Sequence, residues 1–153
     1  MKRIALVVLV LMIPVPALAQ QECWILPAEG SENVVILGVQ HTATTLNEEY
    51  TVIYNRGKIP VDLSGWVIFD SYYEIYRHLP PAERTGDSIL MHVYRIPYGT
   101  ILKSHSWIRI CSGFGKNNEL YLYRNLRTQW LNDEGDTLYL MDNYCNSISE
   151  FTW

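Results

Sequence analysis

The sequence lacks a hydrophobic run long enough to cross a membrane, which would need ~20 apolar residues. Its apolar run from Ile4 to Ile13 follows the basic pair Lys2-Arg3 and is only about ten residues long. The small residues of Ala17-Leu18-Ala19 then stand where a signal peptidase reads a chain. We therefore expect a signal peptide over residues 1–19 and an extracellular or periplasmic mature chain.

Basic residues are also scarce. The chain has 12 Lys and Arg residues against 16 Asp and Glu residues. Cleavage after Ala19 would remove Lys2 and Arg3 and leave a mature chain of 134 residues with a formal charge of −6. Such a chain has the length of one domain, and its acidity argues against indiscriminate binding to nucleic acid or anionic lipid.

The few basic residues are unevenly distributed. Residues 99–127 carry five cations and one acid, Glu119, whereas residues 128–153 carry five acids and no base. The five cations are Lys103, Arg109, Lys116, Arg124 and Arg127, and we call them the basic strip. A basic strip is typical of phosphate binding, but neighbouring strands commonly pair such charges across a solvated face, and we favour the pairing.

The chain has only three cysteines and no CxxC or HxxH spacing, which argues against a metal site. Export permits a disulfide, and an odd count leaves one thiol over. Cys111 and Cys145 both stand at expected strand ends, so we favour that pair, with Cys23 free or joined to another chain. If Ile108 and Ile110 face the core, alternation places Cys111 on the opposite face.

Catalytic and cofactor-binding motifs are missing. Ser104-His105-Ser106 has no GxSxG around it, and neighbours in a strand point to opposite faces. The loop from Ser112 to Gly115 lacks the Gly-Lys-Ser/Thr of a phosphate loop. The acids from Asp133 to Asp136 lack the spacing of a calcium loop. Glu48-Glu49 starts a strand where both side chains can be solvated, and we expect the pair to be structural. We therefore expect no enzyme, no cofactor and no metal.

The sequence is rich in short β-branched and aromatic runs that are separated by turn residues. In the best-defined stretch, Thr51 to Tyr54 ends at Asn55-Arg56-Gly57, Pro60 cannot donate to a ladder, and a second strand begins near Trp66. Further strands are expected at residues 34–39, 94–97, 101–102, 107–111, 119–123, 138–141 and 148–153. The pattern predicts an all-β sandwich of about seven to nine strands.

Within this sandwich, several residues are expected to be structural. The apolar positions are Leu63, Trp66, Val52, Ile108, Ile110, Trp130 and Leu140. In the turns, Gly65 leads into the strand at Trp66, Gly135 can take positive φ, and Asp136 can accept hydrogen bonds from backbone N–H groups.

A long segment, residues 71–93, separates the strand at Trp66 from the strand at Tyr94, where a short hairpin would suffice. It is not disordered in composition, so a short helix or a strand pair folded over one end of the sandwich is expected. Its candidate interaction residues are Tyr72, Tyr73, Tyr76, Arg77 and His78. The segment is either a binding lid or a flap whose aromatic side chains close the core, and the sequence leaves both open.

Six motifs between Asn47 and Asp142 resemble those of the lamin tail domain family, and the resemblance covers about Val34 to Trp153. They are NEEY at 47–50, YN-x-G at 54–57, PVDLSGW at 60–66, PYGTIL at 97–102, ICSGFG at 110–115 and WLNDEGDTLYLMD at 130–142. The resemblance implies an immunoglobulin-like β-sandwich over residues 33–153, preceded by a leader at residues 20–32. It implies no shared chemistry, because such folds are defined by their packing residues.

These patterns predict a secreted, non-catalytic module that mediates protein or cell-surface interaction through residues 71–93. Nucleic-acid binding is an alternative, because the resemblance includes chromatin-associated lamin tails and bacterial modules that accompany nucleases. Polysaccharide binding is another, with Tyr72, Tyr73 and Tyr76 stacking on sugar rings. The partner and the oligomeric state are not encoded in any recognisable motif.

Overall fold

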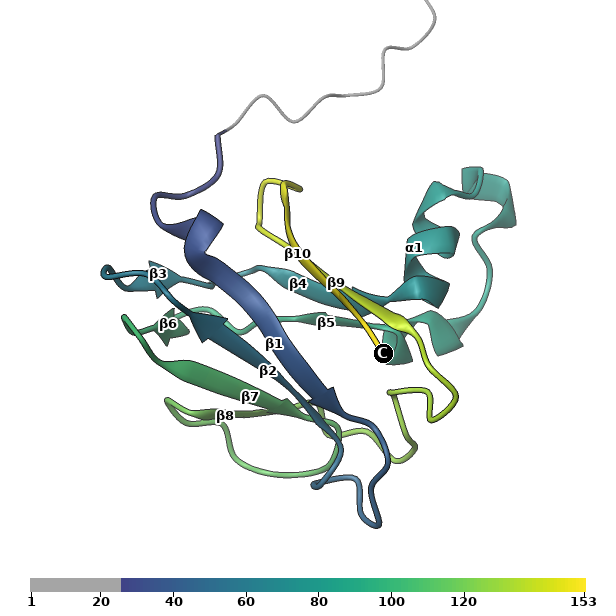
Figure 1. Cartoon of the computed structure of the whole chain (residues 1–153). Coiled ribbons are helices and arrows are strands. Elements are labelled where there is room, and N and C mark those ends of the chain that lie inside the picture. Colours follow the sequence, from purple (N-terminus) through teal and green to yellow (C-terminus); the bar gives the residue numbers. More distant parts are fainter. Residues whose placement is uncertain (1–25) are drawn as a thin grey trace, which may run out of the picture.

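Two four-stranded β-sheets face each other in the structure, a computed structural model that describes residues 26–153 apart from the side chains of residues 87 and 88 (Figure 1). The expected signal peptide and Cys23 lie outside the described residues. The expected all-β, immunoglobulin-like sandwich is confirmed. Within residues 26–153, no helix is long and apolar enough to cross a membrane.

The first sheet has the strand order β1-β2-β7-β8, in which β7 and β8 are parallel and the other pairs antiparallel. The bounds of these strands are β1 Val34–Gln40, β2 Tyr50–Asn55, β7 Trp107–Cys111 and β8 Tyr121–Tyr123.

The second sheet is antiparallel throughout, with the order β10-β9-β4-β5. Its strands are β4 Val67–Asp70, β5 Val93–Arg95, β9 Thr137–Met141 and β10 Ser147–Thr152. A separate pair joins β3 Val61–Asp62 to β6 Ile101–Leu102. The nine expected strands are all present, and β3 is the one that the sequence did not define as a strand.

Within residues 26–153, the helical elements are short. The α-helix α1 spans Ser71–His78 and lies at one end of the sandwich beside β4 and β9 (Figure 1). Three 3-10 helices are η1 Ser31–Asn33, η2 Pro81–Glu83 and η3 Asp87–Met91. Residues 71–93 therefore form a helix followed by two 3-10 turns, which is one of the two expected arrangements.

The core lies between the two sheets and contains most of the expected apolar positions. Leu63, Trp66 and Leu140 are at most 1% exposed, and the Trp66 indole is buried as predicted. Ile108, Ile110 and Trp130 belong to the same cluster. Val52 is only half-buried, because alternation along β2 turns it to the outer face while Ile53 points inward.

Two glycine turns shape the ends of the second sheet. Gly65 precedes β4 with φ of +78°, and Gly135 precedes β9 with φ of +113°. A Cβ at Gly135 would lie 2.7 Å from the carbonyl oxygen of Trp153, so the turn requires glycine on two grounds. Beside it, the Asp136 carboxylate accepts hydrogen bonds from the Ser71 hydroxyl and the Thr137 N–H.

The expected disulfide is not formed, because Cys111 and Cys145 lie at opposite ends of the sandwich, and both are free. Cys111 pairs with Tyr50 at the start of β2, whereas Cys145 lies in the β9–β10 turn. Ser149, near that turn, bonds to Ile36 at the other end of the first sheet.

Cys111 lies on the face that alternation predicted, but its burial was not expected. It lies on the outer face of β7 as alternation requires, yet it is only 2% exposed. Register places it between Tyr50 of β2 and Tyr123 of β8, and directly registered side chains share a face, so the two half-buried rings flank the thiol. Burial raises the pKa of the Cys111 thiol, which makes it a poor nucleophile at neutral pH.

The two long sides of the sandwich differ. On one side β1 and β10 meet, and the Ile36 N–H donates to the Ser149 hydroxyl at 3.0 Å. On the other side lie the edge strands β5 and β8, which no backbone ladder joins. We call this second side the β5–β8 seam.

Candidate binding surfaces

A buried carboxylate, Glu49, lies between the sheets immediately before β2. It is 0% exposed, so this residue is structural as expected, but its carboxylate is buried and not solvated. Its Oε1 accepts hydrogen bonds from the Trp130 N–H at 2.7 Å and from the Ser112 hydroxyl. Alternation along β2 was the available signal, because Ile53, Thr51 and Glu49 share the inward face.

Arg124, which the sequence placed in the basic strip, is also largely buried. Its Nη2 donates to the carbonyl oxygens of Met91 at 2.7 Å and Val93 at 3.1 Å, and its guanidinium lies 3.9 Å from the centre of the Trp130 ring. Burial lowers the pKa of Arg124 to about 10, while the negative charges of Asp70 and Glu49 act in the opposite direction. The Arg124 side chain therefore crosses the β5–β8 seam, and its charged guanidinium links the segment after β8 to the backbone at β5.

The other cations of the basic strip are dispersed. Lys103 pairs with Glu119 at 2.6 Å. The Arg109 guanidinium lies 3.9 Å from the Tyr50 ring centre on the outer face of the first sheet. Lys116 and Arg127 are exposed. The structure thus does not bring the five cations together on one free surface.

Asp70 fixes the start of α1. Its Oδ1 accepts the Tyr73 N–H at 3.0 Å as a helix N-cap, and its Oδ2 lies 2.6 Å from Nδ1 of His92. The carboxylate is almost completely buried, so one side chain joins the end of β4, the first turn of α1 and the residue before β5.

The inner side of α1 is anchored to the sandwich. The Tyr73 ring lies 5.2 Å from the Phe69 ring, and Arg77 lies over the same Phe69 ring at 5.4 Å. Arg77 also pairs with Glu74, and that hydrogen bond lowers the pKa of Glu74, with a smaller contribution from His78. Tyr73 and Arg77 are therefore structural contacts of the helix.

Two apolar side chains of α1 are exposed, although the Tyr72 ring also lies 4.4 Å from the His92 ring. Tyr72 is 54% exposed and Ile75 is 66% exposed, and residues three apart on a helix share a face. We call these two residues the α1 surface. His78 is also exposed, whereas Tyr76 is half-buried with its ring 6.2 Å from that of Tyr73.

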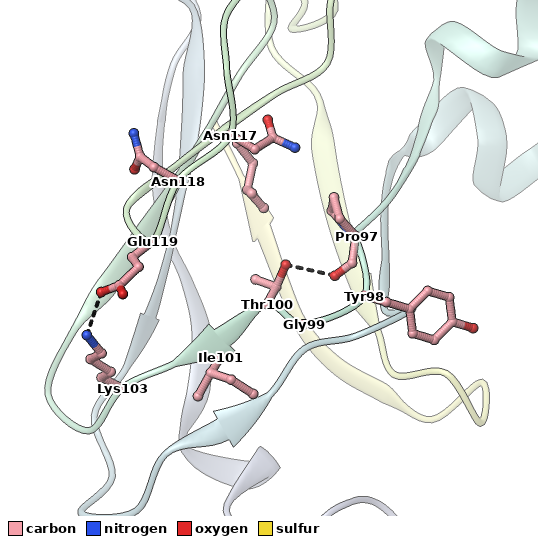
Figure 2. Close-up of a pocket in the computed structure, with 10 residues that line it drawn as sticks. Pro97, Tyr98, Gly99, Thr100, Ile101, Lys103, Asn117, Asn118 and Glu119 are labelled. Atoms are coloured by element: carbon pink, nitrogen blue, oxygen red, sulfur yellow. Dashed lines mark hydrogen bonds and ion pairs between the residues drawn. The ribbon is translucent and has the colours of Figure 1, made fainter.

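A groove that the sequence did not indicate lies on the β5–β8 seam, and we call it the seam groove. Its volume is about 610 Å³, and it runs between the turn at residues 97–101 and the loop at residues 117–119 (Figure 2). The nearly buried Leu122 of β8 lines it and belongs to the core. A groove formed by two segments twenty residues apart has no signature in local alternation.

The described residues offer little for chemistry beyond binding. Within residues 26–153, no group of three His, Cys, Asp or Glu side chains is placed to hold a metal ion. His92 and Asp70 form a pair, but the neighbouring Ser71 hydroxyl donates to Asp136 instead of to that imidazole.

Comparison with known proteins agrees with this architecture. The family model of the lamin tail domain matches residues 27–153, which is most of the chain. A search of curated proteins finds no match. The chain therefore belongs to the lamin tail domain family.

Proposed function

We propose that the chain is a secreted, non-catalytic interaction module that binds a protein or cell-surface component through the α1 surface. Family membership supports an interaction module built on an immunoglobulin-like fold. Secretion is supported by the basic, apolar and small-residue order of residues 1–19.

The observation that carries the proposal is the contrast between the two sides of α1. The inner side is held by Asp70, Phe69 and Arg77, whereas the outer side leaves Tyr72 and Ile75 exposed. A helix held in place before binding loses little conformational entropy when a partner docks. Exposed apolar residues on a rigid support are typical of interaction sites.

The substitution Ile75→Glu tests this proposal. We expect the affinity of the labelled mature chain for intact cells of the source organism to fall about tenfold or more, because a carboxylate would have to be desolvated in the interface. The matched control is Leu37→Glu, which places the same charge on β1 at a residue that is 58% exposed. Equal binding by both variants and the parent chain would refute a role for the α1 surface.

Nucleic-acid binding is the alternative, and it has its own test. We expect no change in the fluorescence anisotropy of a labelled DNA duplex with the mature chain, even at low salt, since Lys103 is paired and Arg124 is buried. Phosphate contacts would instead give binding that weakens steeply as salt rises. That result would replace the proposed protein or surface partner with a nucleic acid.

A further inference from the structure

The seam groove is a second candidate binding site, independent of the α1 surface. It lies on the side of the sandwich where no backbone ladder joins the sheets, and its volume of about 610 Å³ is in the range of small-ligand sites. Figure 2 shows the Lys103–Glu119 pair at one end, Thr100 in the middle and the Tyr98 ring at the opposite end.

An extended peptide does not fit this groove as an added strand. Strand addition needs unpaired N–H and C=O groups along an edge. On β8 the outward N–H groups are already bonded, because the Tyr121 N–H donates to the Asn118 side chain at 3.0 Å and the Tyr123 N–H to the Asn117 side chain at 2.8 Å. The Asn118 N–H in turn donates to the Tyr121 carbonyl at 2.9 Å, so this edge is protected on both kinds of group.

A polyanion does not fit either. The charged side chains that line the groove are Lys103 and Glu119, and their 2.6 Å ion pair cancels the local charge. A phosphate or sulfate approaching Lys103 would also approach the Glu119 carboxylate. The groove therefore favours a ligand without net charge.

We propose that the seam groove binds a neutral saccharide. The adjacent hydroxyls of a sugar both donate and accept hydrogen bonds. The exposed Lys103–Glu119 pair offers a donor and an acceptor side by side, because Lys103 has three N–H donors and the Glu119 oxygen that is not bonded to Lys103 can accept. The Thr100 hydroxyl donates to the Pro97 carbonyl and keeps its acceptor capacity.

Exposed apolar side chains at the rim of the groove suit the C–H faces of the same ligand. Ile101 is 46% exposed and Tyr98 is 84% exposed, with the Tyr98 ring directed outward from the turn, away from the Lys103–Glu119 pair (Figure 2). The turn that carries Tyr98 is fixed, because the Gly99 N–H donates to the Ser64 hydroxyl at 2.8 Å. An aromatic ring on a rigid turn provides a large contact area with little loss of rotamer entropy.

The test is a printed panel of neutral, sulfated and sialylated oligosaccharides, with extended peptides beside them, incubated with the mature chain. We expect retention on neutral glycans, with the affinity reduced about tenfold by Tyr98→Ala. Glu119→Gln is expected to weaken neutral binding and to admit anionic glycans, because Lys103 loses its partner. Both residues are exposed, so the thermal midpoints should stay close to that of the parent chain.

Ile75→Glu is the matched control, because it alters the α1 surface and should leave glycan binding unchanged. Glycan binding at the seam groove and partner binding at the α1 surface are thus tested separately, and either proposal can fail while the other stands. Retention on peptides or anionic glycans alone, or no retention on the panel, would overturn the saccharide proposal. Neutral-glycan binding that is unaffected by Tyr98→Ala and Glu119→Gln would place the sugar elsewhere and would also overturn it.

Discussion

Replacing Glu49 with alanine is expected to destabilise the folded domain by about 3–5 kcal/mol. The substitution leaves the buried Trp130 N–H and Ser112 hydroxyl without their acceptor. It also removes a negative charge that acts on the buried Arg124 guanidinium. A loss of this size is a large share of the stability of a small domain, so partial unfolding at 37 °C is the expected phenotype.

Urea unfolding of the mature chain, followed by tryptophan fluorescence, measures this loss. Glu48→Ala is the matched control, because Glu48 is the exposed neighbour whose carboxylate accepts the Thr45 N–H at 3.1 Å. We expect the control to cost less than about 1 kcal/mol. Glu49→Gln keeps an acceptor oxygen and should fall between the two. Equal losses at positions 48 and 49 would contradict the buried network.

The sandwich could be predicted from the sequence because each strand and turn depends on the identity of a few neighbouring residues. The run Thr51 to Tyr54 alternates between the faces, and the turn after it closes at Gly57, where a Cβ would lie 2.9 Å from that of Asn33. Trp66 follows a glycine turn and is buried as expected. Each of these features depends on a few neighbouring residues, so periodicity and turn chemistry were sufficient.

The sequence did not decide whether residues 71–93 form a helix or a strand pair, and the reason lies at the start of the segment. Asp70 follows the expected strand, and in the structure it ends β4 while its carboxylate caps α1. An aspartate that ends a strand and begins a helix gives both signals at one position. The sequence therefore indicated the insertion and its aromatic content but could not choose between a helix and a strand pair.

The polar contacts between the sheets could not be predicted, because their partners are far apart in the chain. Glu49 meets Trp130, and Arg124 meets Met91 and Val93, across separations of 81, 33 and 31 residues. Acidic and basic side chains are usually solvated, so the charge pattern alone does not indicate that Glu49 and Arg124 lie between the sheets. Alternation would have placed Glu49 inward, but it could not name the groups that satisfy it.

Replacing Arg124 with methionine is expected to destabilise the domain by about 3 kcal/mol. Methionine keeps an unbranched apolar stem against Trp130, but it leaves the Met91 and Val93 carbonyl oxygens without their donor. Arg124→Lys should recover only part of the loss, because an ammonium cannot lie flat over the indole at 3.9 Å while bonding both carbonyls. Arg127→Met is the control, since Arg127 is exposed, and it should cost less than about 0.5 kcal/mol.

Combining Arg124→Met with Glu49→Gln then shows whether the two charges stabilise each other. Neither bonds directly to the other, yet both contact Trp130, one through its backbone N–H and one through its ring. We therefore expect the double variant to lose less than the sum of the single losses, with a coupling of about 1 kcal/mol. If the two losses of unfolding free energy simply add, the hydrogen bond from the Trp130 N–H to Glu49 and the contacts of Arg124 across the β5–β8 seam stabilise the domain independently.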